Sequence, residues 1–482
     1  MTIQKQERII RSVSISARLT KIQFRIVDTL CFLSKNLYNV GVYNERQHYH
    51  AIKQAELVMS SIRPDTFSGI EFGLTSSFIP YSRGKKDPFK DFSNYNLSYP
   101  NENYGLMLAQ TAQQTLQDVD EGYKSFFKLL EKKIKGEYQK PINTPQYLNK
   151  AGRYKVTFPR DSLTFKSNNV TLGMSIKFRK LNKYTGKELT FRIPASIKPH
   201  QIREVALLPI RNGKHYKISF SYEIKKVQKL ELDSTKYLGI DLGVNNFASL
   251  IDNTTGTAIL LDGKYLKSLN WSYNTENAKL QSIKDKQGIT GLTKRQNRLL
   301  NKRENAISEA INRMVNFVIE HAITNKIGNI VCLSWDGVKQ GNKNNRNFVQ
   351  IPFDKFRTRL ESKCKLYEGM KYHGEESEAY TSRTDALNFD TIEDHWYKDA
   401  RRIERGLYSS ITGHLINADI NGAINQIRKV AGDVPAREII SMGRFNRPAR
   451  IRLAYELANF SQTNLNDMCC STEQPTVQSS HL

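Results

Sequence analysis

The sequence predicts a mixed protein, an α/β region preceded by a smaller all-β region, on three observations. Two stretches in the first third repeat apolar residues every three or four positions, which is typical of amphipathic helices. Between residues 153 and 224, short alternating runs follow one another closely, as antiparallel strands do. From Lys236 onward, three strands are succeeded by alternating helix and strand patterns. This last order is the one expected of an RNase H-like fold.

The first half is predicted to be one β domain with helices inserted into it. Residues 7–16 have strand character, residues 23–47 and about 106–133 form the two helices, and residues 64–104 are rich in Pro, Gly, Ser, Asn and Tyr. The first strand is expected to join a small antiparallel barrel or sandwich. Its other strands are predicted in "RYKVTFP", "VTLGMSIKFRK", "ELTFRIP", "IREVALLPI" and "HYKISFSYEI".

The second half carries the α/β pattern. A long helix is predicted at about 292–325 and another at 353–369, and a last helix begins near Asp419. The polar C-terminal end is expected to be disordered. Strands are predicted in "KYLGIDLG", "FASLID", "TAILLDG", "IGNIVCLSW" and "MKYHGEESEAY".

The charge balance points to a polyanionic partner. The 482 residues include 73 Lys and Arg against 47 Asp and Glu, a net charge of +26. So large a surplus favours nucleic acid, and its spread along the whole chain disfavours a membrane-surface helix. We find no signal peptide and no apolar run long enough to span a membrane, so a cytoplasmic, nucleoid-associated protein is expected.

Asp241 lies in the apolar stretch "GIDLGVNNFASL", where a carboxylate is costly unless it is paired. Three interpretations are open: a strand-end Asp satisfied by loop amides, part of a phosphate-binding hairpin as in actin-like ATPases, or a ligand for a hard cation such as Mg²⁺. An ATPase would need further glycine-rich loops downstream, and we find none.

Asp419 in "NADINGAIN" lies at or next to a helix start, beside Ala418, Gly422 and Ala423. It is either a helix cap or a second metal ligand. Two aspartates, one on a first strand and one opening a late helix, are what two-metal phosphodiester cleavage requires. Small residues one turn further on leave room for a nucleic-acid backbone.

Several motifs together resemble the TnpB family of transposon-encoded, RNA-guided DNA endonucleases, which are similar to the ancestors of type V CRISPR effectors. The resemblance covers about 236–430 well. It rests on "GIDLGVNN", "NRNFVQIPFDKFRTRLESKCKLYEG", "EAYTS" and, most specifically, "RGLY…LINADINGAIN". It implies that Asp241 is the first RuvC aspartate and Asp419 the last.

The middle acid departs from the family pattern. Most members carry Glu at the end of the strand matching "IGNIVCLSW", and here that position is Leu333. Either the nuclease is inactive, or the acid has moved to a neighbouring strand end, where Glu378 in "SEAYTS" would serve the same metal. Asp385 is a secondary candidate and Asp336 a third, while the bland interpretation of Glu378 is a solvated loop acid.

Zinc ligands depart as well. The family often has two CxxC pairs before the last motif, but between Tyr380 and Asp419 this chain has only His395 and His414 as soft ligands. A four-ligand zinc site cannot be assembled there, so no zinc is expected. The expected cofactor is Mg²⁺ or Mn²⁺.

Candidate nucleic-acid contacts lie in two basic segments. Arg295, Arg298 and Lys302 share one face of the predicted helix, which is either a solvated face or a phosphate-binding one. The loop from Trp335 to Asn347, which includes Lys339, combines an aromatic ring with amides and cations and is suited to stacking on single strands.

The resemblance implies a guide RNA from the transposon end and double-stranded target DNA, cleaved next to a short motif. The alternatives are a nuclease-inactive, repressor-like RNA-guided DNA-binding protein and a compact type V CRISPR-like effector. The expected domains are a wedge-like β-barrel (1–22 and 150–232), an inserted helical recognition domain (23–149), a RuvC nuclease domain (233–440) and a C-terminal segment (441–482).

Overall fold

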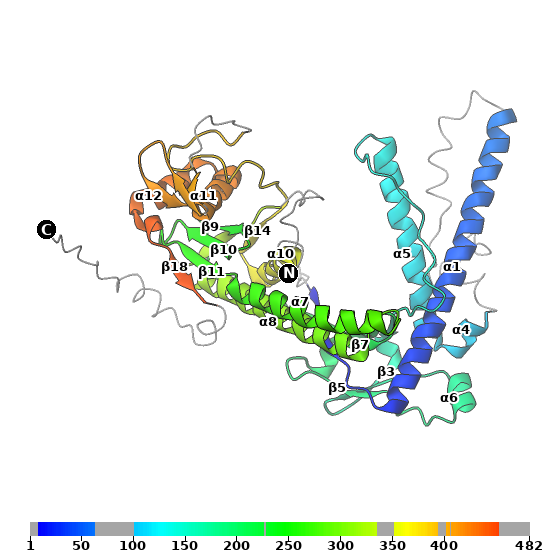
Figure 1. Ribbon diagram of the computed structural model, residues 1–482. Helices are drawn as coiled ribbons and strands as arrows, with labels where there is room; N and C mark the ends of the chain where they lie inside the picture. The colour runs from blue at the N-terminus through cyan, green and yellow to red at the C-terminus, as the bar shows by residue number, and fades with distance from the viewer. Residues whose placement is uncertain are drawn as a thin grey trace, which may run out of the picture. The chain divides into compact units, whose positions relative to one another are not determined.

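The computed structural model describes residues 8–62, 101–225, 228–334, 351–393, 402–404 and 406–452 (Figure 1). The chain divides into two compact units, Met1–Lys225 and Lys226–Leu482. Most of the predicted irregular excursion and the C-terminal end from residue 453 lie outside the described residues. Across those that are described, no helix combines the length and the apolarity needed to cross a bilayer.

The first unit is organised by an antiparallel sheet in the order β1-β7-β6-β2. Strand β1 (Arg8–Ser16) pairs along its whole length with β7 (His215–Lys225). Strand β7 pairs with β6 (Ile202–Ile210), which pairs with β2 (Val156–Pro159). The prediction that the first strand joins the later ones is therefore confirmed.

A second antiparallel sheet, β3-β4-β5, is built from three short strands. Among the described residues it shares no strand pair with the first sheet, so the predicted barrel is not one closed ladder. The predicted strand "VTLGMSIKFRK" is half wrong, because Ser175 accepts a hydrogen bond from the Phe178 amide and starts a helix. The elements are β3 (Leu163–Lys166), β4 (Asn169–Leu172), α6 (Ile176–Asn182) and β5 (Thr190–Arg192).

Three helices complete the first unit: α1 (Lys21–Ile62), α4 (Glu102–Leu106) and α5 (Ala109–Ile134). The N-terminal half of α1 packs on the sheets through Ile26, Leu30 and Leu37, and its later turns lie along α5. Helix α1 is longer than predicted, because Tyr49 still packs on the rings of Phe126 and Phe127. Short 3₁₀ turns occur at Arg160–Ser162 and Pro199–Gln201.

The second unit contains a six-stranded sheet in the order β14-β12-β9-β10-β11-β18. Strands β9, β10 and β11 form an antiparallel meander, while β12 joins β9 in parallel and β14 joins β12 in parallel. Strand β18, which the sequence did not predict, pairs in parallel with β11. The bounds are β9 (Asp233–Leu242), β10 (Asn246–Asp252), β11 (Ile259–Asp262), β12 (Ile327–Val331), β14 (Lys371–His373) and β18 (Ala449–Ile451).

Two helical layers bury the two faces of this sheet. One apolar cluster includes Phe247, Ile311 and Phe356 and joins the sheet to α8 and α10. Another includes Ile251, Ile424 and Ile439 and joins the sheet to α11 and α12. The helices are α7 (Lys264–Lys286), α8 (Lys294–Thr324), α10 (Phe353–Cys364), α11 (Ala418–Ala431) and α12 (Asp433–Met442).

The remaining elements of this unit are short. Two-residue strands β8 (Gln228–Lys229) and β13 (Tyr367–Glu368) pair in parallel, and a three-stranded sheet precedes α11. That sheet consists of β15 (Arg402–Glu404), β16 (Leu407–Ser409) and β17 (Leu415–Asn417), and a 3₁₀ turn follows α12 at Arg444–Asn446.

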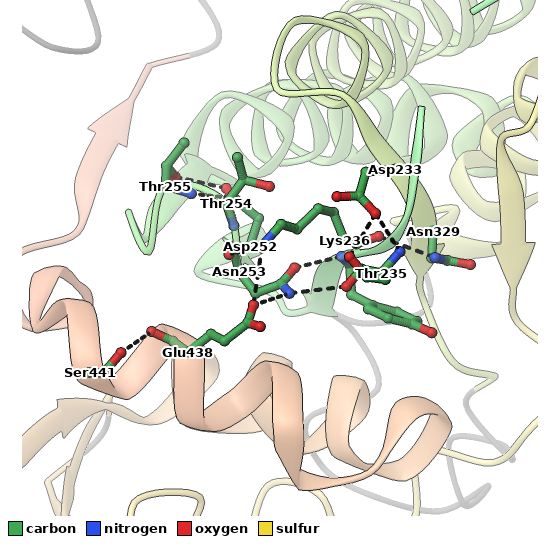
Figure 2. A network of polar contacts seen from close by, with 11 residues as sticks. Asp233, Thr235, Lys236, Asp252, Asn253, Thr254, Thr255, Asn329, Glu438 and Ser441 are labelled. Atoms are coloured by element: carbon green, nitrogen blue, oxygen red, sulfur yellow. Dashed lines mark hydrogen bonds and ion pairs between the residues drawn. The ribbon is translucent and has the colours of Figure 1, made fainter. Parts of the chain in front are cut away.

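A polar network fixes the beginning of β9 to α12 (Figure 2). The Asn253 amide accepts from the backbone N–H of Tyr237 (2.7 Å) and donates to Glu438 (2.7 Å) on α12, where Lys236 also forms an ion pair (3.3 Å). Asn329 on β12 donates to the backbone oxygens of Ser234 and Lys236. This end of β9 is therefore held rigidly, and Asp241 lies at the other end.

Candidate active site

Asp241 lies near the end of β9, in register with Ser249 of β10, and is 8% exposed. Alternate residues of a strand face the same side, so Gly239 and Asp241 both face α11. A Cβ on Gly239 would lie 2.4 Å from the Ala423 carbonyl oxygen, so only glycine lets the helix come this close. On the helix, a Cβ on Gly422 would lie 3.2 Å from the Asp241 carboxyl carbon. These two glycines bring the Asp241 carboxylate against the first turns of α11.

Asp419 is in the first turn of the same helix but does not cap it. The N-cap is Asn417, whose side chain accepts from the backbone N–H groups of Asp419 (3.0 Å) and Ile420 (3.3 Å). The half-buried Asp419 carboxylate instead accepts from Asn246 Nδ2 at 2.8 Å. A Cβ on Gly243 would lie 3.8 Å from its Oδ2. Asp419 therefore faces the β9–β10 hairpin.

The structure thus brings the two predicted aspartates to one place. Asp241 touches Gly422, which lies three residues, or about one helical turn, after Asp419. Asp419 in turn lies beside Gly243, two residues beyond Asp241. The two carboxylates are 178 positions apart by number, and the packing of α11 onto β9 makes them neighbours.

Glu378 lies beside the strand end that carries Leu333. Its backbone N–H donates to the Ser334 oxygen (2.9 Å), and Ser334 forms a parallel bridge with Ser377. Leu333 itself is buried, at 2% exposed. Burial raises the pKa of the nearby Cys332 thiol to about 12, and the negative charges of Glu378 and Asp241 add to this rise against the opposing charge of Arg357. Both acids are therefore within electrostatic reach of Cys332.

The carboxylates do not yet form a closed cage. Within the described ranges, no three His, Cys, Asp or Glu side chains are gathered as a metal-binding group. The secondary candidate Asp385 is fully buried and accepts from the backbone N–H groups of Leu387, Asn388 and Ile411, so it holds a loop. The third candidate, Asp336, lies outside the described residues.

Two amide side chains at the site were not anticipated from the sequence. Gln426 on α11 is fully buried and donates from Nε2 to Asp241 Oδ1 at 3.0 Å. Asn246, at the start of β10, donates to Asp419 and accepts from Arg450 Nη1 at 3.0 Å. The one sequence signal was a polar residue, Gln426, next to Ile427 on a helix whose apolar face is buried.

The candidate basic residues are placed as follows. Arg295, Arg298 and Lys302 are exposed on α8 and line one open groove of about 250 Å³ with Leu280 of α7. Glu276 and Leu299 complete its lining. Trp335, Lys339 and the rest of their loop lie outside the described residues, as does His395.

Comparison with known proteins gives a consistent picture. The model of the OrfB_IS605 family, described as a probable transposase, matches residues 219–333, which include Asp241 and end at Leu333. The TnpB-like protein ORF457 of Acidianus two-tailed virus is 25% identical over 399 residues, covering 78% of this chain and 83% of the viral protein.

Solved structures were also matched. A Cas12f1–sgRNA–target DNA complex aligns with a TM-score of 0.44 and 15% identity, over 84% of this chain and 83% of that one. A CRISPR-Cas12f ternary complex aligns with a TM-score of 0.34 and 13% identity, over 83% and 81%. The family-model match and the viral relative agree with the motifs around Asp241 and Asp419, and the chain belongs to the TnpB family of transposase-associated proteins.

Proposed function

We propose that this chain is a metal-dependent, RNA-guided DNA endonuclease. The observation that carries the proposal is the meeting of Asp241 and Asp419 at the first turns of α11, made possible by Gly422. An aspartate that served only the helix would occupy the cap, and Asn417 already does so. The strand order β14-β12-β9-β10-β11, with three antiparallel strands and then parallel ones, supports an RNase H-like nuclease domain.

Asp241 and Asp419, completed by Glu378, are the side chains that would hold Mg²⁺ or Mn²⁺. Their carboxylate oxygens are hard donors of the type these cations prefer. The approach that Gly422 leaves open lets the two aspartates share one region without a side chain between them. When bound, such ions activate water and stabilise the attacking and leaving oxygens of a phosphodiester.

The substrate side of the proposal rests on charge and on the groove on α8. Guide RNA and target DNA would offer phosphates to Arg295, Arg298 and Lys302, which are exposed together. A net charge of +26 is consistent with holding two nucleic acids. We further propose that the first unit supplies the wedge-like and recognition domains, since β1 pairs with β7 across the inserted helices.

One observation favours a second candidate, a nuclease-inactive RNA-guided DNA-binding protein. Leu333 is buried and apolar at the strand end where the family pattern has its middle acid. If Glu378 does not complete the metal shell, the protein would bind a guided target without cutting it. A repressor-like role would follow, and the same surfaces would be used.

A plasmid cleavage assay separates the two candidates. The protein is purified with the RNA that accompanies it, and this complex is challenged with a target plasmid in Mg²⁺. We expect cleavage by the wild type, none by Asp241→Ala, and retained target binding by that variant. Target binding without cleavage by the wild type would favour the inactive candidate. Full cleavage by Asp241→Ala would overturn the proposed site.

A further inference from the structure

The two aspartates are each held by a neutral amide rather than by a cation. Gln426 Nε2 donates to Asp241 Oδ1 at 3.0 Å, and Asn246 Nδ2 donates to Asp419 Oδ2 at 2.8 Å. An Arg or Lys in either place would offset the negative charge that attracts a divalent ion. A neutral N–H donor fixes the direction of a carboxylate and leaves its charge in place.

The orientation of each amide is set by a second partner. The Gln426 oxygen accepts from the backbone N–H of Leu333 at 3.2 Å, so its nitrogen must be the atom that faces Asp241. The Asn246 oxygen accepts from Arg450, so its nitrogen faces Asp419. Neither amide can flip without placing an oxygen against a carboxylate and a nitrogen against another donor.

Gln426 also links two strand ends. Through Leu333 it touches the end of β12, and through Asp241 it touches the end of β9. Asn246 similarly links β10 to Arg450 on β18. The positions of the carboxylates thus depend on side chains that are themselves tied to the sheet.

We propose that Gln426 and Asn246 are positioning residues that orient Asp241 and Asp419 and thereby set the affinity of this site for divalent cations. This inference rests on the proposed function. Such outer partners of metal-binding carboxylates change metal affinity by about 10–100-fold when they are removed.

The test is Mn²⁺ binding by the full-length, RNA-free chain, followed by electron paramagnetic resonance and calorimetry. RNA is left out because it binds Mn²⁺ itself. The variants are Gln426→Leu and Asn246→Leu, each of which removes one amide at similar volume. The matched control is Asn329→Leu, a buried amide of β12 that bonds to backbone oxygens at the opposite end of the sheet.

We expect the dissociation constant for Mn²⁺ to rise about tenfold or more in Gln426→Leu and in Asn246→Leu, and to stay unchanged in Asn329→Leu. All three variants lose buried hydrogen bonds, so a purely structural role would lower their melting temperatures without this difference in affinity. The Mn²⁺ concentration that half-saturates cleavage should rise in the same order. If Gln426→Leu does not fold, Asn246→Leu, whose amide lies at the start of its strand, decides the matter.

Asp241→Ala distinguishes failure of this inference from failure of the proposed function. If Asp241→Ala loses Mn²⁺ while both amide variants bind it as the wild type does, the positioning role is wrong and the metal site stands. If Asp241→Ala binds Mn²⁺ unchanged, the metal site is wrong and the inference falls with it.

Discussion

Asn417 caps helix α11 by accepting from the backbone N–H of Asp419, so the Asp419 carboxylate faces Asn246 instead. The two residues can therefore be separated by mutation. We expect Asn417→Ala to lower the free energy of unfolding by about 1 kcal/mol, because an N-cap is lost. Asp419→Ala should cost less stability and should abolish cleavage.

Urea denaturation of the two variants and cleavage under saturating Mg²⁺ provide the measurements. Equal destabilisation by both substitutions would show that Asp419 serves the helix and not the site.

Gly422 is predicted to be essential for activity rather than for folding. An added Cβ would lie 3.2 Å from the Asp241 carboxyl carbon and would push that carboxylate away from α11. Alanine in a helix is otherwise favoured over glycine by about 1 kcal/mol. We therefore expect Gly422→Ala to fold at near wild-type stability and to lose most of its cleavage.

Gly105→Ala in α4 is the matched control, because nothing lies within 4 Å of its Cβ position. Wild-type cleavage rates in both glycine variants would contradict the close approach of α11 to Asp241.

The buried pair of Asp252 and His321 is expected to contribute stability that acid removes. Burial alone would raise the pKa of Asp252, but hydrogen bonds from His321 and Thr255 and the charge of His321 lower it below its usual range. A carboxyl with a lowered pKa contributes stability above its unfolded pKa and loses it as the pH falls through the folded one.

Asp252→Asn should flatten this loss. The check is the urea midpoint of the wild type and the variant between neutral pH and the acid limit of folding. Parallel acid profiles for the two proteins would be the contrary result.

Glu45 on α1 should act in the opposite direction. Burial, and then the neighbouring charge of Asp120 on α5, raise the pKa of Glu45 far above its usual range. A carboxyl with a raised pKa contributes its full stability below its unfolded pKa, and that contribution is lost as the pH rises towards the folded one.

We therefore expect α1 and α5 to separate more readily in alkaline solution, and Glu45→Gln to resist this. Urea denaturation at rising pH measures the effect in the full chain. An equal alkaline loss of stability in wild type and variant would contradict it.

The basic groove of α8 is predicted to contribute phosphate contacts. Replacing Arg295, Arg298 and Lys302 with Ala should reduce the dependence of guide-RNA affinity on log salt by up to about three contacts' worth, at roughly 0.7–0.9 each. Lys279→Ala is the control, since that lysine is paired with Glu276 on α7. An unchanged salt slope in the triple variant would leave the groove as an ordinary solvated face.

The sequence predicted what depends on local pattern and missed what depends on distant partners. Asp241 and Asp419 were found because one lies in an apolar strand and the other beside a helix start. Gln426 was missed, because its partner Asp241 lies far away in sequence and an isolated buried Gln carries no motif. Strand β18 was missed because three residues are stabilised only by pairing with β11.

Helix α7 shows a different limit of the pattern. Its buried residues are only Leu266 and Asn270, so it lacks an apolar stripe, and its contact with α8 supplies what periodicity did not reveal. Helix α10 ends at Cys364 and not at residue 369 as predicted, because Tyr367 and Glu368 pair with β8. Such non-local pairing overrides a helical pattern at its end.

The register of β1 against β7 has a consequence for how the first unit can change over evolutionary time. Arg8 is opposite Lys225, so the backbone enters and departs from this unit side by side. Everything between the two strands is an excursion whose ends are already joined by a ladder. The helices there can be lengthened, shortened or exchanged while the polypeptide still reaches the second unit from the same place.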